Sequence, residues 1–243
     1  MAVFGREEIS LWDLPSGKKV WSVPSEHGST IRHEAIIFTP DGRRLITGHD
    51  CTALVWDITR ARRGDDASPA KLSAQELAKL WDTLAGDDAV KAYRAEWRLA
   101  DQPKETLALL RERLKPAKAA EVATVRPLIV QLDSEEDADR EAGSKALFAL
   151  GDAAVPALRQ ALKGKLSAEQ KRRINQVLDA VTAPAVLTGD ALREVRAVSV
   201  LERAATPDAL KLLAELAAGN SEARLTREAA AASKLVNQVI RER

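Results

Sequence analysis

The chain has 243 residues, of which 45% are hydrophobic and 30% charged, a balance typical of globular rather than disordered proteins. Its 37 basic and 36 acidic residues give a net charge of +1, which indicates no general attraction to nucleic acid or anionic membranes. A single cysteine, Cys51, excludes an internal disulfide, and we expect a buried thiol. The sequence contains neither a long apolar run nor a signal-peptide pattern, so we expect no membrane span and a cytoplasmic location.

The first residues predict a pair of short strands. Residues 6–14 and 18–23 each predict a strand, and Pro15-Ser16-Gly17 between them has the composition of a turn. Residues 24–32 predict a loop. This part of the chain is therefore expected to be β-structure.

A hairpin and a third strand are predicted next. Ala35-Ile36-Ile37-Phe38 combines β-branched and aromatic residues and predicts a strand buried on both faces. Pro40-Asp41-Gly42 has turn chemistry, with Gly42 expected at positive φ, and residues 45–47 predict the return strand. Residues 48–50 predict a break, and residues 52–56 a further strand.

Two copies of one pattern occur in this β region. The segments ISLWDL and ALVWDI place Trp12 and Trp56 at an interval of 44 residues (56 − 12), within the period of roughly 40–45 residues typical of propeller blades. With FTPDGRRL and GHDCTALVWDI, this pattern resembles the WD-repeat β-propeller family over about residues 6–58. The resemblance implies a protein-binding surface and a structural hydrogen-bonded tetrad of His27, Thr47, Asp50 and Trp56.

The resemblance covers about one and a quarter blades, within residues 1–59. A propeller needs roughly four to eight blades to close, so we expect the remnant or truncated form of a larger WD-repeat protein. The alternative is that a partner or a second copy supplies the missing blades. Residues 60–71 are polar, contain Gly and Pro, and predict a linker.

Residues 72–243 predict an all-α domain. Ser73 and Glu76 form a capping-box pattern before the first helix, and Pro103 is expected to begin the third. Trp81-Asp82 imitates the earlier Trp-Asp pairs, but it lies in a helical pattern and is interpreted as core. The apolar positions expected to face inward in these three helices are Leu77, Leu80, Trp81, Leu84, Val90, Tyr93, Trp97, Leu107, Leu110 and Leu114.

Residues 125–164 resemble a HEAT-like repeat, which implies paired antiparallel helices. In this segment we expect Pro127 in a first helical turn, Gly151 as a helix break and Asp152 as the cap of the next helix. Ser167 and Gln170 form a second capping-box pattern. Three further helices are expected at about 190–204, 207–218 and 221–240, giving an α-solenoid or irregular bundle.

The sequence predicts no catalytic, metal or cofactor site, so we do not expect an enzyme. Neither a nucleophile elbow nor a phosphate-binding glycine loop occurs in it. The three histidines, His27, His33 and His49, lack ligand-like spacing and are interpreted as structural or solvated.

One cluster of basic residues suggests a binding patch, opposed in the sequence only by Glu169. Such a surface can bind nucleic acid or an acidic protein, although a solvated face has the same composition. Our leading hypothesis is a non-catalytic protein–protein interaction scaffold of unknown partner. The alternatives are nucleic-acid or acidic-partner binding through this patch, with nucleic acid disfavoured, and a regulatory tail of a larger enzyme. The patch residues are Arg159, Lys163, Lys165, Lys171, Arg172 and Arg173.

Overall fold

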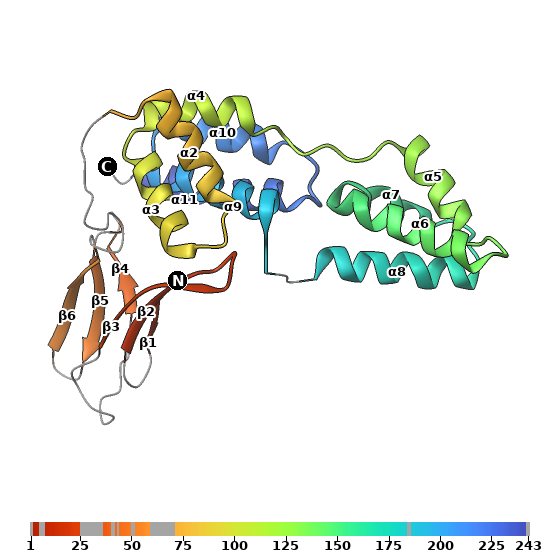
Figure 1. Cartoon of the computed structure of the whole chain (residues 1–243), viewed down its shortest axis with the longest axis horizontal. Coiled ribbons are helices and arrows are strands. Elements are labelled where there is room, and N and C mark those ends of the chain that lie inside the picture. Colours follow the sequence, from red (N-terminus) through yellow and green to blue (C-terminus); the bar gives the residue numbers. More distant parts are fainter. Residues whose placement is uncertain are drawn as a thin grey trace. The chain divides into compact units, whose positions relative to one another are not determined.

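The chain is a mixed structure of small sheets and helices (Figure 1). The computed structural model describes residues 2–4, 8–24, 36–39, 42, 44–49, 52–58, 71–183 and 186–241. In these residues two antiparallel three-stranded sheets precede the α-helices, and the strands do not close into a barrel or propeller. Among the same residues, no helix combines the length and the apolar composition that crossing a membrane requires.

The chain divides into two compact units. Unit one comprises Met1–Leu114, Val186–Leu212 and Ala232–Arg243, and unit two comprises Lys115–Ala185 and Leu213–Ala231. This division differs from the predicted boundary at 60–71, because the strands share a core with helices. Ala89 and Tyr93 of the helical region pack against the strand residues Ile9, Leu11 and Val20.

The sheets of unit one occur largely where strands are predicted. The second strand of each sheet lies in its centre, and neighbouring strands are antiparallel. A short strand at residues 2–4 was not predicted. The strands are β1 (Ala2–Phe4), β2 (Glu8–Asp13) and β3 (Lys18–Pro24) in one sheet, and β4 (Ile36–Phe38), β5 (Arg44–His49) and β6 (Thr52–Asp57) in the other.

Two details of the second hairpin differ from the prediction. β5 continues through the expected break, because Gly48 and His49 pair with β6. The prediction that β4 is buried on both faces is wrong, since Ile37 is 56% and Phe38 43% exposed. β4 is a short strand at the edge of its sheet, whereas Leu45 in the central strand is fully buried. The turn glycine, Gly42, has the expected positive φ of 62°.

The helices of unit one include two that begin where the sequence signals at Ser73 and Pro103 predict. They include α2 (Ala74–Leu84), α3 (Ala89–Ala100), α4 (Pro103–Arg113) and α9 (Gly189–Ala204). The Ser73 capping box is present: the Ser73 N–H donates to Glu76 Oε2 at 2.8 Å, and the Glu76 N–H donates to Ser73 Oγ at 3.3 Å. Trp81 is a buried core residue of α2, as predicted.

Hydrogen bonds join the strands of unit one to its helical part. Lys18 Nζ of β3 donates to the Asp87 carbonyl, before α3, at 2.7 Å. The Leu187 N–H, before α9, donates to the Pro15 carbonyl between β2 and β3 at 2.9 Å. These bonds connect β3 and the β2–β3 turn to the segments that precede α3 and α9.

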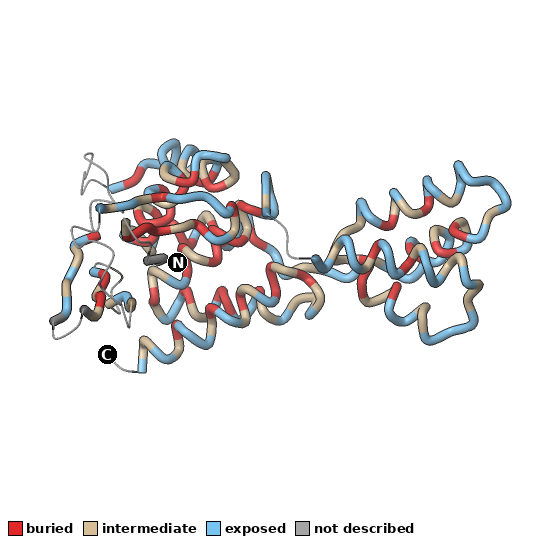
Figure 2. Tube along the Cα trace, turned by 90° about the horizontal axis from the view of Figure 1, so that it is seen from below, coloured by how far each residue is buried: buried red, intermediate tan, exposed pale blue. Residues whose placement is uncertain are grey.

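Unit two is built around its own apolar core. Buried and exposed positions alternate along its helices (Figure 2). The core includes Val125, Leu132, Leu147, Leu158 and Ile174. The helices are α5 (Val122–Gln131), α6 (Asp137–Leu150), α7 (Val155–Leu162) and α8 (Ala168–Thr182), and α10 (Pro207–Ala217) and α11 (Arg224–Arg241) each contribute residues to both units.

Two expectations for unit two are wrong. Pro127 lies inside α5 rather than in its first turn. The position is tolerated because Pro127 and Ala123, the residue four positions earlier whose carbonyl loses its N–H partner, are both exposed to water. Asp152 does not cap α7; its Oδ2 accepts a hydrogen bond from the Arg224 N–H, at the start of α11, at 2.7 Å. Gly151 ends α6 as predicted, with a φ of 54°.

Candidate binding pocket

The structure brings together two members of the predicted tetrad. Thr47 of β5 is buried, and its Oγ1 accepts a hydrogen bond from Trp56 Nε1 of β6 at 3.0 Å. His27 and Asp50 lie outside the described residues, as do His33 and Cys51. The bond links two strands of one sheet, which is a structural role.

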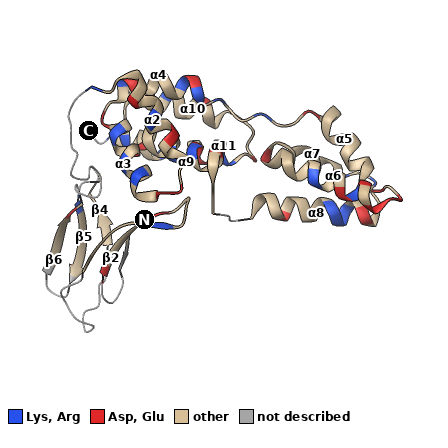
Figure 3. Cartoon of the chain, in the orientation of Figure 1, with Lys and Arg blue, Asp and Glu red and all other residues tan. Residues whose placement is uncertain are grey.

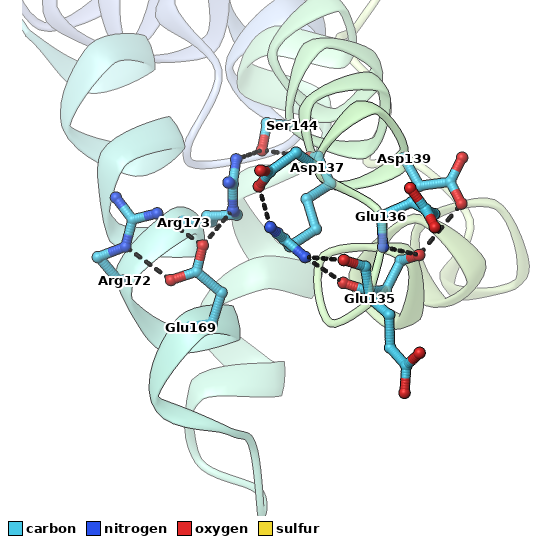
Figure 4. A network of polar contacts seen from close by, with 10 residues as sticks. Glu135, Glu136, Asp137, Asp139, Ser144, Glu169, Arg172 and Arg173 are labelled. Atoms are coloured by element: carbon cyan, nitrogen blue, oxygen red, sulfur yellow. Dashed lines mark hydrogen bonds and ion pairs between the residues drawn. The ribbon is translucent and has the colours of Figure 1, made fainter.

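The predicted basic patch lies in unit two, on α7, α8 and the link between them (Figure 3). Glu169 accepts hydrogen bonds from Arg172 at 2.6 and 2.8 Å and from Arg173 at 2.6 Å (Figure 4). Arg159 Nη1 donates to Glu222 Oε1 at 2.6 Å. The expectation that Glu169 alone opposes the patch is therefore wrong, because the fold brings in a carboxylate from 63 residues away.

Pairing lowers the positive charge of this patch. Three of its six cations, Arg159, Arg172 and Arg173, are bonded to carboxylates. At the start of α8, Ser167 Oγ donates to Asp133 Oδ1 at 2.6 Å, which places another acidic residue beside the patch. These contacts favour a solvated, internally paired surface over a binding site for polyanions.

The ion pairs of the patch can be tested through the pKa of Glu169. Hydrogen bonds from Arg172, and then from Arg173, lower the pKa of Glu169 from 4.5 to about 2. Because the folded-state pKa is lowered, this contribution to stability is present above pH 4.5 and is lost as the pH falls through about 2. We expect a carbon-detected NMR titration of the Glu169 carboxyl to show a midpoint near 2.

Substitutions at neighbouring cations provide the control. Arg172→Gln removes the strongest donor and should move the Glu169 midpoint back toward 4.5. Lys171→Gln removes one positive charge at the neighbouring position and should leave the Glu169 midpoint unchanged. A wild-type midpoint near 4.5 would show that these hydrogen bonds do not persist in solution.

A second cluster of charges lies in the interior of unit one, and sequence reasoning missed it. Arg196 of α9 is fully buried, and its guanidinium donates to Asp13 Oδ2 of β2 at 2.7 Å. It also donates to the carbonyls of Leu84 and Gly86, at the end of α2, at 2.7 and 2.9 Å. Arg196 thereby connects α9 to β2 and to the C-terminus of α2. Asp13 also accepts a hydrogen bond from Ser16 Oγ.

An ion pair, Glu96 with Arg203, and two aromatic rings lie next to this interior cluster. Glu96 of α3 is only 2% exposed and is hydrogen-bonded to Arg203 of α9. The guanidinium carbon of Arg203 lies 5.2 Å from the ring centre of Tyr93 and 5.0 Å from that of Trp97. The two rings meet edge to face at 6.3 Å. Cation–π contact and the carboxylate together fix the Arg203 side chain.

These side chains form one wall of a cavity in unit one. Its volume is about 730 Å³, within the usual range for ligand pockets. Gly42, which lies between β4 and β5, approaches the same wall closely: a Cβ on Gly42 would lie 2.9 Å from Trp97 Cη2. Strands, α3, α9 and the end of α11 thus contribute to a single pocket. Its aromatic and basic lining includes Trp12, Phe38, Tyr93, Trp97 and Arg203.

Exposed apolar side chains border this pocket. Leu14, Phe38 and Leu235 line it and are 62%, 43% and 52% exposed. Large apolar side chains that gather beside a cavity are a common mark of an interaction site. Trp, Tyr and Arg are also the residue types most enriched where binding energy concentrates in protein interfaces.

Comparisons of the chain with protein-family models, curated proteins and solved structures gave no match. The candidate function therefore depends on the pocket itself. One sequence signal could have indicated the buried cluster: Arg196 interrupts an apolar segment, Val195 to Leu201, at a position where the helix faces the core.

Proposed function

We propose that the chain is a non-catalytic protein-interaction module that binds a short segment of a partner in the pocket of unit one. The observation that carries this proposal is the gathering of exposed Leu14, Phe38 and Leu235 beside a wall of Trp97, Tyr93 and Arg203. An apolar rim and a fixed aromatic wall can bury an inserted side chain without reorganisation of the site.

The scaffold role expected from the WD-repeat and HEAT-like resemblances belongs to the same proposal. The partner segment binds in a pocket to which both strands and helices contribute residues. The tetrad contact between Thr47 and Trp56 supports the sheet that carries one side of that pocket. The basic patch on α7 and α8 is the weaker candidate, because half of its cations are paired within unit two.

Selection of displayed random peptides on the full chain tests the proposal. Leu235→Glu places a charge at the pocket and, since Leu235 is 52% exposed, should leave the core intact. We expect enriched peptides to bind the wild type at least about tenfold more tightly than this variant, a difference of about 1.4 kcal/mol.

The matched control introduces the same charge elsewhere. Phe148 of α6, in unit two, is 55% exposed and does not line the pocket, so Phe148→Glu should leave peptide affinity unchanged. Equal affinities for the wild type and Leu235→Glu, or a failure to enrich any peptide, would refute the proposal. Circular dichroism melting curves of both variants verify that they fold.

A further inference from the structure

The sheet of β4, β5 and β6 has an inner and an outer face. Leu45 of β5 and Trp56 of β6 belong to an apolar core that also contains Ile9 and Leu11 of β2. Successive side chains of a strand point to opposite faces of its sheet. The residues that alternate with Leu45 and Trp56 therefore lie on the outer face.

Three β-branched side chains form an apolar row across that outer face. Ile37 of β4 pairs with Ile46 of β5, and Ile46 pairs with Val55 of β6. Ile37 is 56% and Val55 58% exposed, and Ile46 is half-buried. None of the three lines the pocket of unit one, so the row is a second apolar surface that is separate from the pocket.

The register of β5 with β6 gives this outer face a regular composition. Three cross-strand pairs lie on it, and the two members of each pair are of complementary kinds. One pair has opposite charges, the next has two branched apolar side chains, and the last has two small residues. The pairs are Arg44 with Asp57, Ile46 with Val55, and Gly48 with Ala53.

Such a face is complementary to itself under two-fold symmetry. A two-fold axis that runs parallel to the strands, in front of the face and midway between β5 and β6, stacks β5 of one copy on β6 of the other. Each cross-strand pair then meets the same pair with its members exchanged. Ile46 packs on Val55 of the second copy, and Arg44 faces Asp57 of the second copy, so that like charges are kept apart.

We infer that the outer face of this sheet is an interface between two copies of the chain. The two sheets stack face to face, about 10 Å apart, with the apolar rows in contact. A second copy is the occupant that the register favours, because the face matches itself in charge, in apolar character and in side-chain size. This interface is separate from the pocket and goes beyond the proposed function.

The size of the face sets the strength of the dimer. β5 and β6 have six residues each and β4 has three. Strands of that length and spacing cover at most about 14 by 20 Å. This area is well below the roughly 800 Å² per partner of a standard stable interface. The dimer is therefore transient, with a dissociation constant on the order of 100 μM.

Sedimentation velocity of the full chain, from about 20 to about 500 μM, tests this interface. We expect the average mass of the wild type to rise toward that of a dimer. Val55→Lys places two buried lysines in each dimer and should weaken association at least about tenfold. Val130→Lys is the matched control: Val130 lies in unit two and is 65% exposed, so association should not change.

Exchange of charges tests the stacking of Arg44 on Asp57. Arg44→Glu and Asp57→Arg should each weaken self-association about tenfold, because two like-charged contacts form in each homodimer. An equimolar mixture of these two variants should recover the association of the wild type, since opposite charges then meet at both contacts. This recovery separates contacts between copies from any effect within one copy, because each variant in the mixture retains its own altered charge.

An NMR dilution series of the wild type locates the interface without any substitution. We expect amide signals of β5 and β6 to shift with concentration while those of α5 and α6 stay in place. A wild type that stays monomeric at about 500 μM would refute the inference. It would also be refuted by association that Val55→Lys leaves unchanged, by a charge-exchanged mixture that associates no better than its components, or by shifts confined to other elements.

Discussion

Replacing Arg196 with methionine is expected to lower the free energy of unfolding of unit one by about 3–5 kcal/mol. The guanidinium is fully buried and bonded to Asp13 and to two carbonyls at the end of α2. Methionine fills much of the same volume but leaves the Asp13 carboxylate in the interior without its cation. The penalty arises mainly from that uncompensated buried charge rather than from lost packing.

Two further variants separate this cause from a general effect of charge removal. Arg193→Met makes the same substitution on the same helix at a more exposed side chain and should cost about 1 kcal/mol or less. Asp13→Leu combined with Arg196→Met removes both charges and should recover part of the lost stability. Urea denaturation followed by tryptophan fluorescence measures all three. A loss below about 1 kcal/mol for Arg196→Met would show that the buried pair does not hold β2 to α9.

Replacing Gly219 with alanine is expected to destabilise unit two by about 1–3 kcal/mol. A Cβ at this position would lie 2.8 Å from both Ala117 N and Thr226 Oγ1, and 2.9 Å from Ala117 O. The backbone of Ala117 cannot move away easily, since its carbonyl accepts the Asn220 N–H at 2.7 Å. Thr226 is itself buried, so neither neighbour can yield without disturbing the packing around it.

Gly164→Ala is the matched control in the same unit. A Cβ there would approach only the Ala161 carbonyl, at 3.2 Å, near the exposed end of α7. We expect its melting temperature to stay close to that of the wild type, while Gly219→Ala melts several degrees lower. Equal melting temperatures would show that the segment before α5 shifts freely to accommodate a methyl group at residue 219.

Local features of the fold could be predicted because their causes are local. The capping boxes of Ser73 and Ser167 depend on residues three positions apart, and both are present. Pro103 begins α4 as expected, and the positive φ of Gly42 and Gly151 follows from the absence of a side chain. Each of these signals lies within a few residues of the structure that it determines.

The pocket could not be predicted because its residues come from distant parts of the sequence. Phe38, Trp97 and Leu235 each occupy an ordinary position in the pattern of a strand or a helix, and only the fold brings them together. The prediction that Asp152 caps α7 is wrong for the same reason, since its carboxylate accepts a hydrogen bond at the start of a helix that begins 72 residues later. The pairing of Arg159 with Glu222 was missed for the same reason.

The most direct measurement of the proposed interaction is an NMR titration of the full chain with the enriched peptide. The five tryptophan indole N–H signals report on separate places in the molecule. Trp12 and Trp97 line the pocket, whereas Trp81 lies in the core of α2 and does not. We predict that the Trp12 and Trp97 signals move during the titration while the Trp81 signal stays in place. Changes confined to residues of α7 and α8, with Trp97 unmoved, would contradict the account.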